Sequence, residues 1–428
     1  MTGTITKTAV RTVTVNQDRL WESLMALARI GAYDEAATGL VGVNRQSLTD
    51  ADRTGRKLFV SWLEEAGLRI RIDQLGNIFG RRQGSDPEAA PVMAASHIDS
   101  VATAGAFDGC LGVLGALEVV RTLNEQNIAT VRPIDIAAFT EEEGVRFGTD
   151  MLGSAVAAGR LTLDYAYDLV DEAGLRLGDE LDRIGFRGEV DVALRPPHAY
   201  VECHIEQGPV LASEGFEIGV VTGVQAISWQ KVTLHGRAAH AGTTPTELRI
   251  DAGLAAAQIV CHVRAMVSSG NYGRLRGTVG HIATYPGLPS VVPDRAELTV
   301  DLRNPDDGHM AAAEADLAAF LGTLDTEQPG LRVETTRMAK TNQVPFDADI
   351  QAAIAAAADD LGYTHRPLMS GAGHDAQEIA AIAPTAMIFV PGEYDGISHN
   401  PREYSTPEAC GHGINVLATT LLRLAGRA

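Results

Sequence analysis

Short apolar strands that alternate with helices are the feature of this sequence that most restricts its fold. Pro91–His97 and Pro133–Phe139 have the length and apolar character of buried parallel strands, and Gly109–Leu123 between them is typical of a helix. Upstream, Thr49–Gly67 begins with polar residues, has amphipathic spacing and ends in glycine, which indicates another helix. The pattern predicts βαβ units, in which a parallel sheet carries its functional loops at the carboxyl ends of the strands.

A different pattern begins near Glu217 and continues to about Ala339. The expected order there is strand, strand, helix, strand, strand, helix, strand, with Glu217–Val224 as the first strand. This order is typical of an α+β sandwich of the ferredoxin-like kind. The α/β pattern then returns with a helix at Ile350–Leu361 and a strand at Thr385–Val390. The predicted boundaries are 1–214 and 338–428 for the α/β domain and 215–337 for the smaller inserted domain.

The length and charge of the chain limit its organisation and its partners. At 428 residues it is too long for one ordinary hydrophobic core, so two domains are expected. Its 35 basic and 55 acidic residues give a net charge of −20. This charge disfavours nucleic acid and anionic membranes as partners, and an anionic substrate would need local positive charge or metal ions.

Two further features concern the cellular compartment. Met1–Leu20 contains no continuous apolar stretch, and no other window approaches the length of a membrane span. The cysteines are few, widely spaced and without a CxxC pair; they are Cys110, Cys203, Cys261 and Cys410. We therefore expect a cytoplasmic protein without a secretion signal.

Histidines and carboxylates recur where the predicted strands end. His97 closes one apolar run, Glu141–Glu143 follow the next, and His204 ends a third. Asp108 lies among glycines before a helix, and His399 lies in a loop near the C-terminus. Each residue alone is more often structural, but together they suit a metal such as zinc, which takes imidazole and carboxylate ligands. The set exceeds the needs of one tetrahedral ion, so two ions sharing a carboxylate are expected.

These residues lie in motifs that resemble those of the zinc-dependent amidase/hydantoinase/carbamoylase family, which is related to the co-catalytic zinc aminopeptidases. The resemblance extends from about residue 20 to the C-terminus, through SHIDSV, FDGCLGV, EEEGVRF, HIEQGP, AAHAGTTP, GAGHDA and GISHNP. It implies an α/β catalytic domain like that of the zinc aminopeptidases, and a ferredoxin-like lid through which the chain forms a homodimer. It also implies two divalent metal ions per subunit, zinc first, with manganese or cobalt as alternatives.

The resemblance assigns metal-binding roles to the residues at the strand ends. Asp108 would bridge the two ions. His97 and His399 would complete the coordination of one ion, and His204 would complete that of the other. Glu143 would be a further ligand.

Catalytic and substrate-binding roles also follow from the resemblance. Glu142 would be the general base, Asp99 would orient the ring of His97, and His240 in the lid would stabilise the oxyanion across the dimer. Arg303 would grip a substrate carboxylate. The full set of implied substrate contacts is Gln207, Trp229, Ser290, Arg303, Gly371, Ala372, Gly373 and His374.

The resemblance favours metal-dependent hydrolysis of a linear C–N bond, with N-carbamoyl-L-amino acids as substrates. Ser290 stands where the family usually has asparagine, which leaves open an N-acyl amino acid deacylase or a dipeptidase on the same core. β-Ureidopropionase and allantoate amidohydrolase activities are further alternatives. Trp229 lies where allantoate-type members are expected to be basic, which counts against allantoate. A non-catalytic dimeric binding protein is disfavoured, because every ligand position is retained.

Overall fold

The computed structural model describes residues 12–428, which form two compact units. The larger unit extends to Gly223 and resumes at Phe346, and the inserted unit comprises Val224–Pro345. Among the described residues, no helix is both long and apolar enough to span a bilayer. The sequence predicts that Met1–Leu20 contains no secretion signal. Residues 1–11 of this segment lie outside the described chain.

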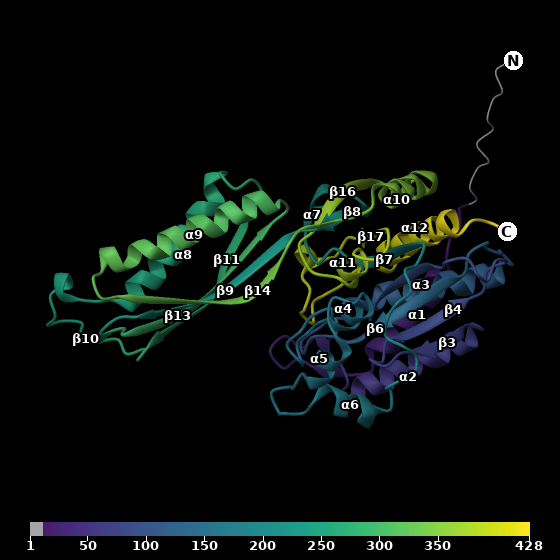
Figure 1. The fold of residues 1–428 in the computed structure, drawn as a ribbon. Helices are drawn as coiled ribbons and strands as arrows, with labels where there is room; N and C mark the ends of the chain where they lie inside the picture. The colour runs from purple at the N-terminus through teal and green to yellow at the C-terminus, as the bar shows by residue number, and fades with distance from the viewer. Residues whose placement is uncertain (1–11) are drawn as a thin grey trace, which may run out of the picture. The chain divides into compact units, whose positions relative to one another are not determined.

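A mixed sheet forms the centre of the larger unit (Figure 1). Its strands, in spatial order, are β15 (Val344–Pro345), β8 (Ile218–Val224), β17 (Thr385–Val390), β7 (Ala199–Ile205), β5 (Val92–His97), β6 (Ile134–Phe139), β4 (Ile78–Arg82) and β3 (Arg69–Ile72). A further strand, β16 (His365–Ser370), pairs with β8, and β1 (Ala32–Asp34) and β2 (Val41–Val43) form a separate hairpin. The neighbouring strands β17, β7, β5 and β6 are parallel and fully buried. The sequence predicted buried parallel strands for two of these, β5 and β6.

Helices cover this sheet, and local sequence explains where several of them begin. The helices of the larger unit are α1 (Gln17–Ala28), α2 (Asp50–Glu65), α3 (Cys110–Glu125), α4 (Leu152–Ala157), α5 (Leu163–Asp168), α6 (Leu177–Ile184), α7 (Val210–Glu214), α10 (Ala348–Leu361), α11 (Asp375–Ile379) and α12 (Pro407–Ala425). Thr49 and Thr406 cap α2 and α12 by accepting a backbone N–H in the first turn. Helices α3 and α12 pack on β5 and β7 and on each other.

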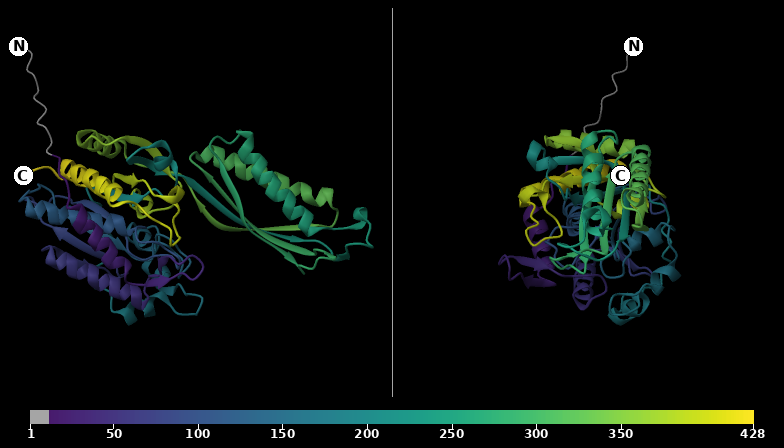
Figure 2. Two further views of the ribbon diagram at one scale, coloured as in Figure 1. Left: turned by 180° about the vertical axis from the view of Figure 1, so that it is seen from behind. Right: turned by 90° about the vertical axis from the view of Figure 1, so that its left-hand side faces the viewer.

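The inserted unit has the βαββαβ order of a ferredoxin-like fold. Its main elements are β9 (Ala226–His235), α8 (Ala252–Ser269), β11 (Arg276–Tyr285), β13 (Arg295–Asn304), α9 (Asp307–Glu327) and β14 (Arg332–Thr341), with short strands β10 (Ala239–His240) and β12 (Val291–Val292). The antiparallel sheet has the order β11-β13-β9-β14, and α8 and α9 lie along one of its faces (Figures 1 and 2). Leu298, Val300 and Leu302 of β13 are buried while the residues between them are not, as expected for a sheet covered on one face.

The boundaries of the inserted unit differ from those predicted. The prediction assigned Glu217–Val224 to the inserted sheet, whereas β8 pairs with β17 in the sheet of the larger unit. Strand β14 also continues to Thr341, beyond the predicted end at residue 337. The backbone N–H of Phe346 donates to the carbonyl oxygen of Thr222 at 3.0 Å, so the chain leaves and re-enters the larger unit at one place. An apolar strand does not reveal from its own sequence which sheet it joins.

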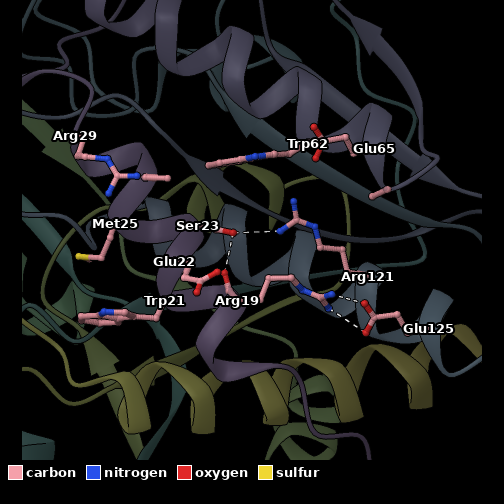
Figure 3. Close-up of a pocket in the computed structure, with 12 residues that line it drawn as sticks. Arg19, Trp21, Glu22, Ser23, Met25, Arg29, Trp62, Glu65, Arg121 and Glu125 are labelled. Carbon is pink, nitrogen blue, oxygen red and sulfur yellow. Dashed lines mark hydrogen bonds and ion pairs between the residues drawn. The ribbon is translucent and has the colours of Figure 1, made fainter.

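A pocket of ≈ 730 Å³ is lined by α1 and by the C-terminal parts of α2 and α3 (Figure 3). Arg19 on its wall is paired with Glu118 and Glu125, and Arg121 donates to the hydroxyl of Ser23. None of the residues predicted for the functional site lines this pocket.

Candidate metal centre

The carboxyl ends of four parallel strands bring the predicted ligands together. His97 is the last residue of β5, His204 lies next to the end of β7, and Glu141–Glu143 follow β6. His399 lies in the loop after β17. Because these strands are neighbours, their carboxyl ends share one edge of the sheet, which is where α/β proteins bind their ligands.

Asp108 reaches this edge from the loop that precedes α3. The next residue, Gly109, has a φ of 64°, a conformation that favours glycine. A Cβ atom at Gly109 would lie 2.3 Å from Nε2 of His97. Glycine is therefore required at this position both by the backbone and by the close approach of His97.

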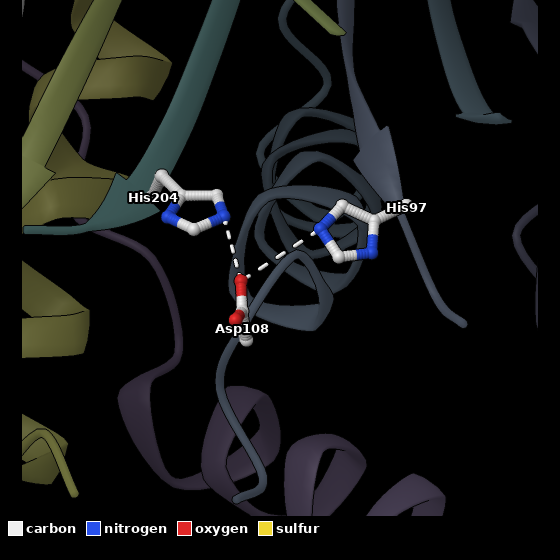
Figure 4. A group of neighbouring side chains, drawn as sticks. All are labelled: His97, Asp108 and His204. Carbon is white, nitrogen blue, oxygen red and sulfur yellow. Dashed lines mark ion pairs between the residues drawn. The ribbon is translucent and has the colours of Figure 1, made fainter. Parts of the chain in front are cut away.

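Asp108 lies between two groups of side chains. Its Oδ1 lies 3.1 Å from Nε2 of His204 and 3.7 Å from Nε2 of His97 (Figure 4). Its Oδ2 lies 3.1 Å from Nε2 of His399, which in turn lies 3.3 Å from Oε2 of Glu143. Each group offers ligand atoms within 4.8 Å of one another. This grouping corrects the prediction that His97 and His399 serve one ion, because the two oxygens of Asp108 face different histidines.

The charges in these groups suit divalent cations. Three imidazoles and two carboxylates are ligands that zinc and similar ions accept. No lysine or arginine among residues 12–428 forms an ion pair with Asp108 or Glu143. Hydrogen bonds to Asp108 and Glu143 raise the pKa of His399 to about 11, which shows how strongly the carboxylates attract positive charge. The two groups could therefore hold metal ions.

Glu142 lies beside the first group, with its Oε2 3.4 Å from Nε2 of His97. Burial, together with repulsion from Asp375 and Glu143, raises the pKa of Glu142 well above its usual value. The backbone N–H groups of Glu142 and Glu143 donate to the carboxylate of Asp99 at 3.4 and 3.3 Å. Asp99 thus joins the ends of β5 and β6. Its main-chain oxygen, 3.1 Å from Nδ1 of His97, is a closer partner of that ring than its carboxylate, which is 3.8 Å away.

A third cluster lies behind His204 and includes a residue predicted to touch substrate. The ring of His374 is 1 % exposed and lies 4.6 Å from the ring of His204, centroid to centroid. Its Nε2 lies 2.9 Å from the hydroxyl of Ser370. Glu202, which the sequence analysis did not identify, accepts hydrogen bonds from Tyr200 and from the backbone of Ala376. His374 is therefore a buried neighbour of His204, a predicted metal ligand, and not an exposed surface residue.

The other residues predicted near the centre are closer to its surface. Nε2 of Gln207 donates to Oδ2 of Asp108 at 2.9 Å, and its buried Oε1 has no hydrogen-bond partner among the described side chains and backbone. Gly371, Ala372 and Gly373 form a half-buried loop, in which the Ala372 N–H donates to Ser370 Oγ at 3.1 Å.

The remaining predicted residues belong to the inserted unit. His240 on β10 is exposed, and β10 pairs with β12, beside which Ser290 is also exposed. Arg303 and Trp229 share the face of the sheet opposite the helices, with the guanidinium 5.7 Å from the centre of the indole. Arg303 donates to both carboxylate oxygens of Asp301 at 3.0 to 3.1 Å. A sequence alone does not show that this arginine already has a neighbouring carboxylate.

Comparison with known proteins agrees with this geometry. A profile of peptidase family M20/M25/M40 matches residues 93–423. The chain is 45% identical over 415 residues to the N-carbamoyl-L-amino-acid amidohydrolase of Rhizobium meliloti, covering 96% of this chain and 97% of that protein. Its identity to the N-carbamoyl-L-amino acid amidohydrolase of Geobacillus stearothermophilus is 39% over 415 residues, or 96% and 99% of the two chains.

A solved structure extends the likeness to the fold. The amidase of the hydantoinase/carbamoylase family from Burkholderia multivorans matches with a TM-score of 0.91 and 43% identity, covering 96% of this chain and 98% of that chain. The chain therefore belongs to peptidase family M20/M25/M40, and the resemblance to the hydantoinase/carbamoylase amidases is confirmed.

Proposed function

We propose that this protein is a metal-dependent amidohydrolase that converts N-carbamoyl-L-amino acids to L-amino acids, ammonia and carbon dioxide. The observation that carries the proposal is the position of Glu142, whose carboxylate lies 3.4 Å from His97 beside a cluster of zinc-type ligands. The substrate class rests on the 45% and 39% identity to proteins named for this reaction.

Two divalent ions, zinc first and manganese or cobalt as alternatives, would be held by the groups that share Asp108. His97 and His204 would hold one ion, and Glu143 and His399 would hold the other. When bound, such ions lower the pKa of a water molecule and polarise a carbonyl group.

Glu142 would transfer the proton. As a general base it accepts a proton from the attacking water, and as a general acid it delivers that proton to the nitrogen of the departing amino acid. The carbamic acid released in the same step decomposes to ammonia and carbon dioxide. Glu142 is 7% exposed, which limits competing hydrogen bonds from bulk water. The hydrogen bonds from Glu142 and Glu143 to Asp99 fix the backbone that carries both glutamates.

Arg303 would bind the substrate carboxylate by a two-pronged contact, for which its planar guanidinium is suited. The proposed contacts also include Trp229, Ser290, Gln207 and the loop of Gly371, Ala372 and Gly373, with His374 supporting His204 from behind. His240 would donate to the oxyanion of the neighbouring subunit's substrate in a cytoplasmic homodimer.

Ammonia release from a panel of substrates tests this proposal. The panel contains N-carbamoyl-L- and D-amino acids, β-ureidopropionate and allantoate, with free amino acid measured in parallel for N-acetyl amino acids and dipeptides. We expect turnover of N-carbamoyl-L-amino acids that disappears on thorough chelation and returns with added zinc, manganese or cobalt. Activity that survives metal removal contradicts the mechanism, and preference for N-acetyl compounds or dipeptides contradicts the substrate.

A further inference from the structure

Glu403 is a buried carboxylate to which the proposed chemistry gives no role. It is 5% exposed. Its Oε1 accepts the backbone N–H groups of Phe107 at 2.9 Å and Asp108 at 3.1 Å. Its Oε2 accepts the hydroxyl of Ser398 at 2.8 Å. These donors belong to two distant segments of the chain, and each segment carries a proposed metal ligand, Asp108 in one and His399 in the other.

The hydroxyl of Ser398 connects Glu403 to the side chain of Asp108 as well as to its backbone. Ser398 Oγ lies 3.1 Å from Oδ2 of Asp108, and Nε2 of Gln207 donates to both atoms, at 3.2 and 2.9 Å. Oδ2 is also the atom that faces His399. Because a hydroxyl has one hydrogen, Ser398 can donate to only one of the two carboxylates at a time. Glu403 therefore acts directly on the backbone of Asp108, and its Oε2 competes with Oδ2 of Asp108 for the hydrogen of Ser398.

The surroundings of Glu403 leave it little freedom to move. A Cβ atom on Gly105 would lie 2.4 Å from Cβ of Glu403, so the two segments touch there. The rings of Trp21, Phe107 and Tyr404 pack together beside it, with centroids 5.6 to 6.0 Å apart. A carboxylate closed in this way holds its donors in one geometry.

We propose that Glu403 is a positioning residue that sets the distance between Asp108 and His399 and thereby the metal affinity of the group they form with Glu143. The inference rests on the proposed metal centre. Hydrogen-bonded partners that orient ligands typically change metal affinity about 10- to 100-fold when they are lost.

Zinc affinity, measured by competition with a chromophoric chelator, tests this inference. Glu403→Ala removes the acceptor for all three donors and should weaken zinc binding about 10- to 100-fold. Glu403→Gln keeps an oxygen that can accept the two backbone N–H groups, so it should bind zinc more tightly than Glu403→Ala. The matched control is Glu118→Ala, because Glu118 is 1% exposed and accepts the backbone N–H of Asn16 at 3.2 Å. It lies on α3 ten residues after Asp108, about 15 Å along the helix.

A merely structural role predicts that Glu403→Ala and Glu118→Ala both lower the melting temperature while the folded protein binds zinc like the wild type. That result overturns the inference. Wild-type protein that binds no zinc, manganese or cobalt overturns the proposed centre instead. If Glu403→Ala does not fold, Ser398→Ala replaces it, since it removes only the connecting hydroxyl. Zinc binding weakened in Ser398→Ala supports the inference, and unchanged binding overturns it.

Discussion

Oδ1 of Asp108 lies 3.1 Å from Nε2 of His204, and the opposite nitrogen of that ring faces a main-chain carbonyl. Nδ1 of His204 lies 2.8 Å from the oxygen of Ile205, which can only accept, so the ring hydrogen belongs on Nδ1. The N–H of Gly109 donates to Nε2 at 3.2 Å, which agrees with a lone pair on that atom. His204 therefore presents a lone pair beside Asp108, in the arrangement usual for a metal-binding histidine.

Removing the charge of Asp108 should abolish metal binding and activity together. Asp108→Asn keeps the size of the side chain but removes the negative charge shared by both groups. We expect zinc to raise the melting temperature of the chelator-treated wild type, because a ligand that binds the folded state stabilises it. Zinc should not raise the melting temperature of Asp108→Asn. Differential scanning calorimetry and elemental analysis measure both effects. Asp301→Asn in the inserted unit is the control and should keep the zinc response. Two ions retained by Asp108→Asn would contradict the bridging role.

Glu142→Gln should separate catalysis from metal binding. The amide cannot accept a proton from water, so kcat should fall by about 10²- to 10⁴-fold, the usual contribution of a general acid–base group. Metal content should remain that of the wild type, because Glu142 is not among the proposed ligands. The adjacent Glu141→Gln is the matched control. Glu141 is also buried, but its Oε1 accepts the N–H of Phe147 at 2.8 Å, a bond that glutamine can keep. Metal lost together with activity in Glu142→Gln would argue that Glu142 is a ligand.

His240→Ala tests whether the inserted unit completes the site of a partner. Loss of one oxyanion donor should lower kcat by about 10²- to 10³-fold with less change in KM. Mixed Glu142→Gln and His240→Ala subunits should regain activity, since one site in each heterodimer has both groups intact. His309→Ala, another exposed histidine of the inserted unit, serves as the control and should leave kcat unchanged. Subunits that exchange, yet stay inactive when mixed, exclude sharing across a dimer.

Arg303→Met should lower kcat/KM more for substrates that carry a carboxylate than for substrates that lack one. Hydrogen bonds to a charged group contribute about 1.5–3 kcal/mol, so kcat/KM for an N-carbamoyl amino acid should fall about 10- to 100-fold. The corresponding amide, which lacks the carboxylate, should be affected much less. Arg295→Met is a close control because Arg295 lies on the same strand and also covers an aromatic ring, that of Tyr285. Equal losses for the acid and the amide would assign Arg303 a structural role.

Glu314 should make the inserted unit less stable in acid. Although partial burial opposes it, hydrogen bonds from Lys340, Ser228 and Arg337 lower the pKa of Glu314 from 4.5 to about 2. A lowered folded-state pKa contributes stability that is present above pH 4.5 and is lost as the pH falls towards 2. The difference in urea midpoint between wild type and Glu314→Gln should therefore be largest near neutral pH and shrink in acid. Glu334→Gln, an exposed position on β14, is the control. A difference that grows as the pH falls would contradict the assignment.

Local patterns predicted the strands and the residues at their ends, and distant contacts explain what was missed. His97 and His204 follow buried apolar runs, so their position at a sheet edge could be inferred from the sequence around each of them. Which histidine faces which oxygen of Asp108 depends on side-chain directions in four segments, and no single segment contains that information. The packing of His374 against His204 could not be predicted from the sequence either, and its role as a substrate contact, which the resemblance implies, stays a prediction. Glu403 was missed because its partners are backbone groups of a distant loop.

The hydrogen bond between Phe346 and Thr222 also has an evolutionary consequence. A segment whose two ends meet can be gained, lost or exchanged in one recombination event without shifting the register of the strands around it. Every proposed metal ligand lies outside Val224–Pro345, whereas His240, Ser290 and Arg303 lie within it. If the proposed roles of these residues hold, exchange of the inserted unit could change substrate preference while the proposed metal centre stayed unchanged.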